Sequence, residues 1–159
     1  MLFKSGRPVA IINGSYSCPA FRKNTKRLNK FDKTNLDTCD IYIVYLQEAH
    51  PKINSPYGGL LNDFVLNKKQ KIKFKEAKYL EERIYYANKA SKDFKLTPVV
   101  LVDNENNDFF WKVNGAPNGY MYFNKDGELI EQRNWYYVSK HNMRKRLRHQ
   151  KRVAKHLKK

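Results

Sequence analysis

Apolar residues along this chain follow two kinds of spacing. Short runs rich in Ile, Val and Tyr occupy residues 7–13, 39–47 and 97–103, and such runs, bounded by turn-forming residues, predict buried strands. Between them, apolar residues recur every three or four positions over residues 19–31 and 74–94, which predicts two amphipathic helices. The residues expected on the buried faces of these helices are Phe21, Leu28, Phe31, Ala77, Leu80, Ile84, Ala87 and Ala90.

The pattern changes after the third predicted strand. Residues 104–118 are irregular, with one helical turn expected around Phe109 and Trp111. Residues 119–135 predict a hairpin, closed by the Asp-Gly pair at 126–127. Because strands and helices alternate first and an antiparallel pair follows, the sequence predicts an α/β protein with a central mixed sheet flanked by helices. This element order is that of a thioredoxin-like fold.

Positive charge is concentrated at the C-terminal end. The chain has 159 residues and a formal net charge of +17, and ten of its Lys and Arg residues lie in residues 140–159, which contain no acid. We expect one thioredoxin-like domain over residues 1–138 and a basic helix or tail over residues 139–159. This segment either docks on the sheet as a last helix with a solvated cationic face or contacts nucleic-acid phosphates. The residues expected to make such contacts are Arg144, Lys145, Arg146, Arg148, Lys151 and Arg152.

The sequence pattern contains no membrane or export signal. No apolar run approaches the length that spans a bilayer, and the first residues lack the apolar length and the cleavage site of a secretory signal. Two cysteines do not make a disulfide framework. We therefore expect a soluble intracellular protein, cytoplasmic by default or nuclear through its basic segment, with no membrane partner.

Cys18 raises the main chemical question, because it stands between a predicted strand and a predicted helix. Four roles are open to it: a buried small apolar residue, half of a disulfide, a metal ligand or a reactive thiolate. A helix N-terminus offers unpaired N–H groups and the positive end of a dipole, which stabilise a thiolate, and Arg22 and Lys23 add positive charge. This context favours the reactive thiolate over the buried structural residue.

The surrounding residues narrow these roles. Residues 15–18 are Ser-Tyr-Ser-Cys, which excludes a Cys-x-x-Cys dithiol. Cys18, Cys39 and His50 lack the spacing of a zinc site, so we expect no metal. Cys39 either resolves an oxidised Cys18 or packs beside the sheet, and packing is the favoured role.

Two segments resemble the iodothyronine deiodinase family. "NGSYSCPAF" (residues 13–21) is similar to the family's active-site segment Gly-Ser-x-Thr-Sec-Pro-Pro-Phe, with Cys18 at the selenocysteine position and Ser17 at the threonine position. "IYIVYLQEAHP" (residues 41–51) is similar to the second family motif, a strand ending in Glu-Ala-His. The helix start "LEERI" and the later strand and hairpin follow in family order, so the resemblance covers residues 7–135.

The resemblance implies a peroxiredoxin-like variant of the thioredoxin fold and a thiol-dependent oxidoreductase. Cys18 would attack a halogenated or peroxidic substrate, and Ser15, Glu48 and His50 would form the hydrogen-bonding and proton-transfer set around it. No bound cofactor is implied, and the partners would be a small-molecule substrate and an external thiol that donates electrons. The implied substrate pocket comprises Tyr16, Ser17, Pro19 and Pro117, the last either at the family's cis-proline position or an ordinary loop proline.

The chain departs from the family where the hormone is held. The family's histidine and arginine that contact the hormone fall near Ala77 and Gly119, and Cys18 supplies sulfur in place of selenium. The peroxiredoxin motif is incomplete as well, because Ile11 stands where that family has proline. We therefore expect feeble iodothyronine deiodination. The alternative function is a nucleic-acid-associated basic protein that retains the fold without catalysis.

Overall fold

The fold is known from a computed structural model, which describes residues 5–35, 37–51, 74–113 and 117–133. Its helices and strands follow the order that the hydrophobic pattern predicts. They are β1 (Val9–Gly14), α1 (Pro19–Thr34), β2 (Asp40–Tyr45), α3 (Leu80–Phe94), β3 (Val99–Val102), α4 (Asp108–Lys112), β4 (Tyr120–Phe123) and β5 (Leu129–Arg133).

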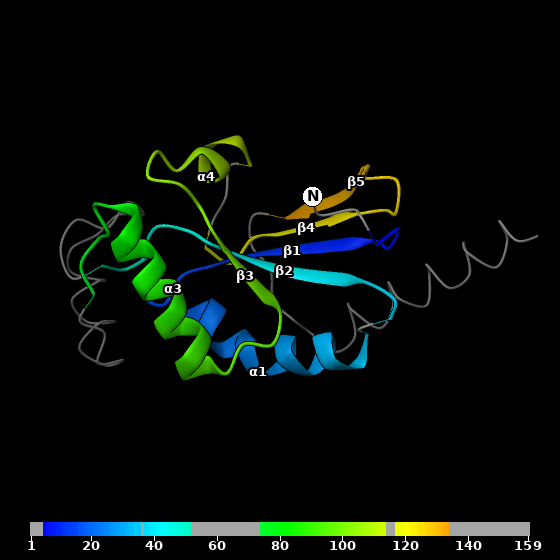
Figure 1. The fold of residues 1–159 in the computed structure, drawn as a ribbon, viewed down its shortest axis with the longest axis horizontal. Helices are drawn as coiled ribbons and strands as arrows, with labels where there is room; N and C mark the ends of the chain where they lie inside the picture. Colours follow the sequence, from blue (N-terminus) through cyan, green and yellow to red (C-terminus); the bar gives the residue numbers. More distant parts are fainter. Residues whose placement is uncertain (1–4, 36, 52–73, 114–116, 134–159) are drawn as a thin grey trace, which may run out of the picture.

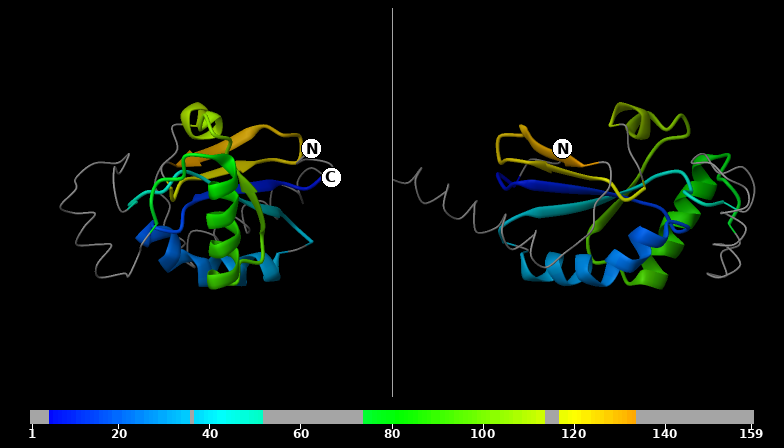
Figure 2. Two further views of the ribbon diagram at one scale, coloured as in Figure 1. Left: turned by 60° about the vertical axis from the view of Figure 1, so that its left-hand side comes forward. Right: turned by 180° about the vertical axis from the view of Figure 1, so that it is seen from behind.

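The strands form one mixed sheet in the order β3-β2-β1-β4-β5. β1, β2 and β3 are parallel, whereas β4 runs antiparallel to β1 and β5 antiparallel to β4. Both parallel connections step in the same direction across the sheet, and right-handed crossovers therefore put α1 and α3 on the same face. Figures 1 and 2 show these two helices together beneath the sheet and the short helix α4 on the other face.

The core lies on both faces of the sheet because its central strand is buried at every position. All six residues of β1 are buried. The apolar cluster between the sheet and α1 includes Ile12, Ile43 and Phe21. The cluster on the face that carries α4 includes Ile11, Val44 and Phe110. A parallel strand that is covered on both faces needs a continuous run of apolar residues, and residues 7–13 provide one.

The register brings three chain segments to one edge of the sheet. Gly14 at the end of β1 pairs with Tyr45 at the end of β2. Tyr120, the first residue of β4, pairs with Ile12 near the same end of β1. The segments that follow β1 and β2 and the segment that precedes β4 therefore meet at this edge, which carries Cys18.

Helix α3 differs from the prediction in its start and in its buried face. It begins at Leu80 and not at Phe74, because the Glu82 carboxylate accepts hydrogen bonds from the N–H groups of Lys78 (2.7 Å) and Tyr79 (3.4 Å) and so caps the first turn. Ile84, predicted on the buried face, is 40% exposed, whereas the adjacent Arg83 is 3% exposed.

The last described elements agree with the prediction. The helical turn expected around Phe109 is α4, which Asp103 caps by accepting hydrogen bonds from Phe109 N–H and Phe110 N–H, both at 3.0 Å. In the hairpin loop, Gly127 has a left-handed backbone conformation (φ 84°), which glycine adopts without steric cost. The predicted basic helix or tail over residues 139–159, and with it the domain boundary at 138, lies outside the described residues. No helix in the described part of the chain is long and apolar enough to cross a membrane.

Candidate functional site

Cys18 occupies the N-cap of α1, as the sequence predicts. Its own N–H donates to Ser15 O at 3.2 Å, and Phe21 N–H donates to the Cys18 sulfur at 3.4 Å. Pro19 opens the helix, where the missing N–H of proline costs nothing. Gly14 permits the tight entry to this turn, because a Cβ at that position would lie 2.4 Å from the ring of Phe21.

The second motif is joined to the cysteine turn through main-chain donors. After β2, Leu46 N–H donates to Gly14 O at 2.9 Å, which extends the sheet ladder by one step. Ala49 N–H then donates to Ser15 Oγ at 3.1 Å. The two predicted motifs, far apart in sequence, are thus held side by side by the serine that the first of them contributes.

Ser17 and His50 make the next contact between the two segments. His50 N–H donates to Ser17 Oγ at 2.9 Å, and the His50 side chain is half-buried while Ser17 is fully buried. The structure therefore places Ser15, Ser17 and His50 where the sequence put them, next to the turn that carries Cys18. Their proposed roles in proton transfer stay predictions.

Glu48 is the hub of this network. Its Oε2 accepts a hydrogen bond from Ser17 N–H at 2.7 Å, and its Oε1 accepts one from the Tyr45 hydroxyl. That hydroxyl in turn accepts from Tyr16 N–H at 3.0 Å. Burial raises the pKa of Glu48, while the hydrogen bonds from Ser17 and Tyr45 oppose that rise. Glu48 therefore positions the cysteine turn through Ser17 and Tyr45. Among the hydrogen bonds of the described residues, none joins its carboxyl group to the Cys18 sulfur.

The electrostatics of Cys18 correct the sequence-based expectation of a stabilised thiolate. Cys18 is 2% exposed, and burial raises the pKa of its thiol. The N–H groups of Phe21 and Ala20 lower that pKa, as expected of a helix N-terminus, and the charge of Glu48 raises it. Burial outweighs the helix terminus because the thiol packs in the same apolar cluster as Phe21 and Ala49.

Glu76 is a site residue that the sequence did not reveal. Both of its carboxylate oxygens are buried, near the main-chain N–H groups of Glu48 and Ala77, which lower its pKa. Burial raises the pKa of Glu76 to about 7; the charge of Glu48 raises it as well, and that of Arg83 lowers it. Nothing in the local pattern of residues 74–79 distinguishes this carboxylate from a surface one, since the charges that act on it belong to Glu48, which follows β2, and to Arg83 of α3.

Arg83 is the second residue missed, and it explains the altered face of α3. Its guanidinium donates to Asp103 O at 3.1 Å and to Asn104 O, so it ties the helix to the end of β3. A buried arginine is rare unless it is paired, and here two main-chain carbonyls and the nearby Glu76 charge compensate it.

Tyr16 lies at the rim of the site among aromatic rings. Its hydroxyl donates to Asp93 Oδ2 at 2.7 Å, and burial together with this carboxylate raises the pKa of Tyr16 to about 12. The ring centroid lies 4.5 Å from that of Phe74 and 4.8 Å from that of Phe94, and the Arg22 guanidinium lies 5.6 Å from the ring. Tyr16 is therefore fixed at the end of α3, beside the predicted pocket residues Ser17 and Pro19.

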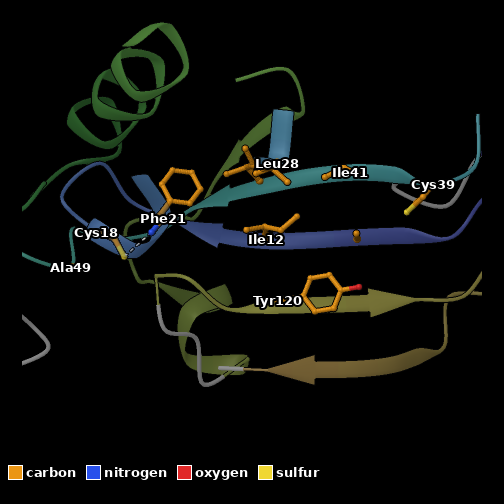
Figure 3. Close-up of a cluster of buried hydrophobic side chains, with 10 residues drawn as sticks. Ile12, Cys18, Phe21, Leu28, Cys39, Ile41, Ala49 and Tyr120 are labelled. Carbon is orange, nitrogen blue, oxygen red and sulfur yellow. Dashed lines mark hydrogen bonds between the residues drawn. The ribbon is translucent and has the colours of Figure 1, made fainter. Parts of the chain in front are cut away.

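The position of Cys39 corrects the alternative that it resolves Cys18 within one chain. Figure 3 shows the two cysteines at opposite ends of the sheet. Cys39 precedes Asp40, which pairs with Val9, whereas Cys18 follows Gly14 at the far end of β1. At about 3.3 Å per strand residue this separation is about 16 Å, and a disulfide needs Cα atoms within about 7 Å. Cys39 is buried and free, as expected of a packing residue.

Pro117 lies at the same sheet edge as Cys18. It is buried, and the two residues after it bind the neighbouring segments: Asn118 Oδ1 accepts from Asn24 Nδ2 at 3.2 Å, and Gly119 O accepts from Asn13 N–H at 2.9 Å. The peptide bond before Pro117 includes a residue outside the described part. Its membership of the substrate pocket stays a prediction.

Comparison with known proteins identifies the fold. No protein-family model matches the chain, and no curated protein matches it in sequence. Among solved structures, a thiol-disulfide oxidoreductase from Bacteroides fragilis is similar with a TM-score of 0.56 and 10% identity over 89% of this chain and 82% of its own. The exposed lipoprotein thioredoxin Etrx1 of Streptococcus pneumoniae gives 0.53 and 12% over 91% and 85%. A secreted Mycobacterium tuberculosis disulfide oxidoreductase, homologous to E. coli DsbE, gives 0.52 and 11% over 87% and 78%. The predicted thioredoxin-like fold is thus confirmed.

Proposed function

We propose that this chain is a thiol-dependent oxidoreductase in which Cys18 supplies the reacting sulfur and an external thiol restores it. One observation carries the proposal: Cys18 caps α1 at the sheet edge where the serines of its own turn hold the Glu48 and His50 segment. A helix N-terminus stabilises a thiolate, and a neighbouring acid and histidine can transfer protons during its reaction.

Formation of the thiolate depends on the protonation of Glu48. The two helix N–H groups favour a negative sulfur, while burial and the charge of Glu48 oppose it. Burial also disfavours the charged form of Glu48, so a neutral carboxyl removes that repulsion and leaves the helix donors to act. His50, half-buried beside Ser17, is proposed to accept the thiol proton as substrate enters.

The proposed reaction balances with two external thiols. With a peroxide, the Cys18 thiolate forms an S–O bond as the O–O bond breaks, and the departing alkoxide takes one proton. The resulting sulfenic acid reacts with one external thiol to give a mixed disulfide and water. A second external thiol then attacks that disulfide, which releases Cys18 as a thiol and the donor as its own disulfide. The donor must be external because Cys39 lies at the other end of the sheet.

The finer proposal concerns a halogenated substrate, in line with the deiodinase resemblance. Here the thiolate forms an S–I bond as the C–I bond breaks, and the carbon takes a proton; the first external thiol then forms the mixed disulfide and releases iodide and a proton. The positions of the family's hormone-holding side chains carry Ala77 and Gly119, both buried and without polar side chains. We therefore propose that a peroxide or a smaller halogenated compound is consumed faster than an iodothyronine.

The test compares three proteins with dithiothreitol as the donor. Wild type and the matched control Cys39→Ser should consume peroxide or an iodinated phenol at similar rates, whereas Cys18→Ser should fall to the uncatalysed rate. Equal consumption by Cys18→Ser and wild type would remove Cys18 from the mechanism. Brisk turnover of an iodothyronine would contradict the role assigned to Ala77 and Gly119.

A second candidate function, that of a basic protein without catalysis, is favoured by one observation. Cys18 is 2% exposed, and burial raises its pKa, as in a packing residue. The pH dependence of iodoacetamide labelling of Cys39→Ser, in which Cys18 is the only thiol, distinguishes the two candidates. A labelling midpoint well below the ordinary pKa supports the oxidoreductase; a midpoint above it, together with no peroxide turnover in the separate assay, supports the second candidate.

A further inference from the structure

A groove runs along the helical layer and extends from the cysteine turn toward the C-terminal end of α1. It has a volume of about 800 Å³ and lies between α1 and the C-terminal end of α3. It begins at Pro19, one residue from Cys18, and continues along α1 to Lys33. Its lining includes five cationic side chains, from Arg22, Lys23, Lys26, Lys33 and Lys95, and a single acid, Asp93.

The wall formed by α1 is unusually one-sided in charge. The helix carries six Lys and Arg residues, whereas its only acid, Asp32, is buried at 7% exposure. Lys26 and Lys30 lie four residues apart, and Lys23 and Lys26 three, so like charges face each other on the helix surface. Each such pair destabilises a helix, and a bound polyanion would relieve this repulsion.

The exposed lysines of this wall are available to a ligand. Lys23, Lys26 and Lys33 are not in an ion pair or side-chain hydrogen bond with any described residue, in contrast to Lys89 of α3, whose Nζ lies 3.1 Å from Asp93. Asp93, the one acid of the groove, is already engaged by Lys89 and by the Tyr16 hydroxyl. The groove therefore presents uncompensated positive charge.

The spacing of this charge fits a nucleic-acid strand. Lys23, Lys26, Lys30 and Lys33 follow one face of α1, and at 1.5 Å per residue they span about 15 Å. Lysines at this spacing can each contact a different phosphate of a strand laid along the helix. Phe94 also lines the groove, but its ring packs 4.8 Å from that of Tyr16 and lies 5.8 Å from the Arg22 guanidinium, so the contacts with a strand come from the lysines.

We propose that this groove binds single-stranded nucleic acid through its phosphates, independently of the reaction at Cys18 and of the basic segment 140–159. Its concave form suits a flexible single strand, because readers of a duplex insert a protruding helix or ribbon into the major groove. The contacts with the phosphates come from the lysines that line the groove, Lys23, Lys26, Lys33 and Lys95.

The test uses the full chain and two triple variants with the same loss of charge. The groove variant is Lys26→Gln/Lys33→Gln/Lys95→Gln, which leaves in place Lys23, the lysine nearest to Cys18 in sequence. The matched control, Lys78→Gln/Lys112→Gln/Lys125→Gln, removes three exposed lysines from other faces of the molecule, and both variants change the formal net charge from +17 to +14. Equal thermal unfolding by circular dichroism establishes that both variants are folded.

Binding of a fluorescently labelled oligo(dT) of about 20 nucleotides is followed by anisotropy between about 50 and 200 mM salt. The groove variant should lose at least about tenfold in affinity at the middle of this range, and its slope of log K against log salt should be shallower by about 2, at about 0.7 per phosphate contact. The control should stay within about twofold of wild type.

Three outcomes would overturn the proposal. Equal weakening by both triple variants would mean that net charge alone is responsible, and unchanged binding by the groove variant would place the contacts elsewhere on the chain. Displacement of the labelled strand by polyglutamate as effectively as by unlabelled oligo(dT) would mean that the groove accepts any polyanion. Because Cys18 is untouched, peroxide turnover of the groove variant should equal that of wild type, so this test fails or succeeds separately from the proposed oxidoreductase activity.

Discussion

Replacement of Glu76 by Gln should remove a buried charge that the fold opposes at neutral pH. The pKa of Glu76 is raised from its ordinary 4.5 to about 7 by burial and by the neighbouring charge of Glu48. Between these two values the folded chain binds more protons at this site than the unfolded chain. The stability associated with Glu76 is therefore complete below pH 4.5 and is lost as the pH rises through about 7.

The size of the effect follows from the pKa. A rise from 4.5 to about 7 corresponds to about 3 kcal/mol at 1.36 kcal/mol per pKa unit. Because Glu76 is only half-buried, solvent screening reduces this to about 1 to 2 kcal/mol. Gln has the shape of a protonated Glu, so wild type and Glu76→Gln should be similar in stability near pH 4.5, and the variant should be about 1 to 2 kcal/mol more stable at pH 8.

Urea unfolding followed by circular dichroism, at several pH values from 4.5 to 8, measures both proteins. The difference between their free energies of unfolding isolates Glu76, because the other titrating groups are common to both. Parallel stability curves across this pH range would refute the argument that burial raises the pKa of Glu76. A wild type that gains on the variant as the pH rises would mean that Arg83 dominates over burial and Glu48.

Three further substitutions test the contacts around the site. Tyr45→Phe removes the acceptor of Tyr16 N–H and a donor to Glu48, so the free energy of unfolding should fall by about 1 to 3 kcal/mol. The control is Tyr122→Phe, because the Tyr122 hydroxyl is buried without a partner among the described residues. This control should leave the free energy of unfolding unchanged or slightly raised. Gly14→Ala places a Cβ 2.4 Å from the Phe21 ring and should lower the free energy of unfolding, measured in urea, by about 1 to 3 kcal/mol. In the double variant with Phe21→Leu, part of that loss should be recovered. If the effects of the two substitutions on the free energy of unfolding simply add, the clash is contradicted. Arg83→Met removes the positive charge near Glu76, so the pH-dependent loss of stability should move to higher pH than in wild type. If the midpoint of that loss is unchanged, the charge of Arg83 does not affect the pKa of Glu76.

The sequence alone determined the features that depend on neighbours along the chain. The β-branched runs identified β1, β2 and β3, because parallel strands covered on both faces need continuous apolar residues. Pro19 located the start of α1, and the Asp-Gly pair at 126–127 located the hairpin turn, since both residue types limit the backbone locally. The order of these elements was enough to predict the thioredoxin-like fold and the place of Cys18 at a helix N-terminus.

Only the tertiary structure decided the features that depend on distant segments. Helical periodicity could not choose between Ile84 and Arg83 for the buried face of α3, because the choice depends on the carbonyls at the end of β3. The meeting of Ser15 and Ser17 with Ala49 and His50 required the parallel register of β1 and β2.

The pKa values of the site residues also depend on segments that are distant in sequence. A helix N-terminus predicts a stabilised thiolate at Cys18, but the apolar cluster around the sulfur and the carboxylate of Glu48 reverse the direction of the pKa. Glu76 acquires its raised pKa from burial and from the charge of Glu48, which follows β2, and Cys39 is separated from Cys18 by the length of a strand. Burial and the distances between charges are set by the packing of segments that are remote in sequence, so local patterns carry no record of them.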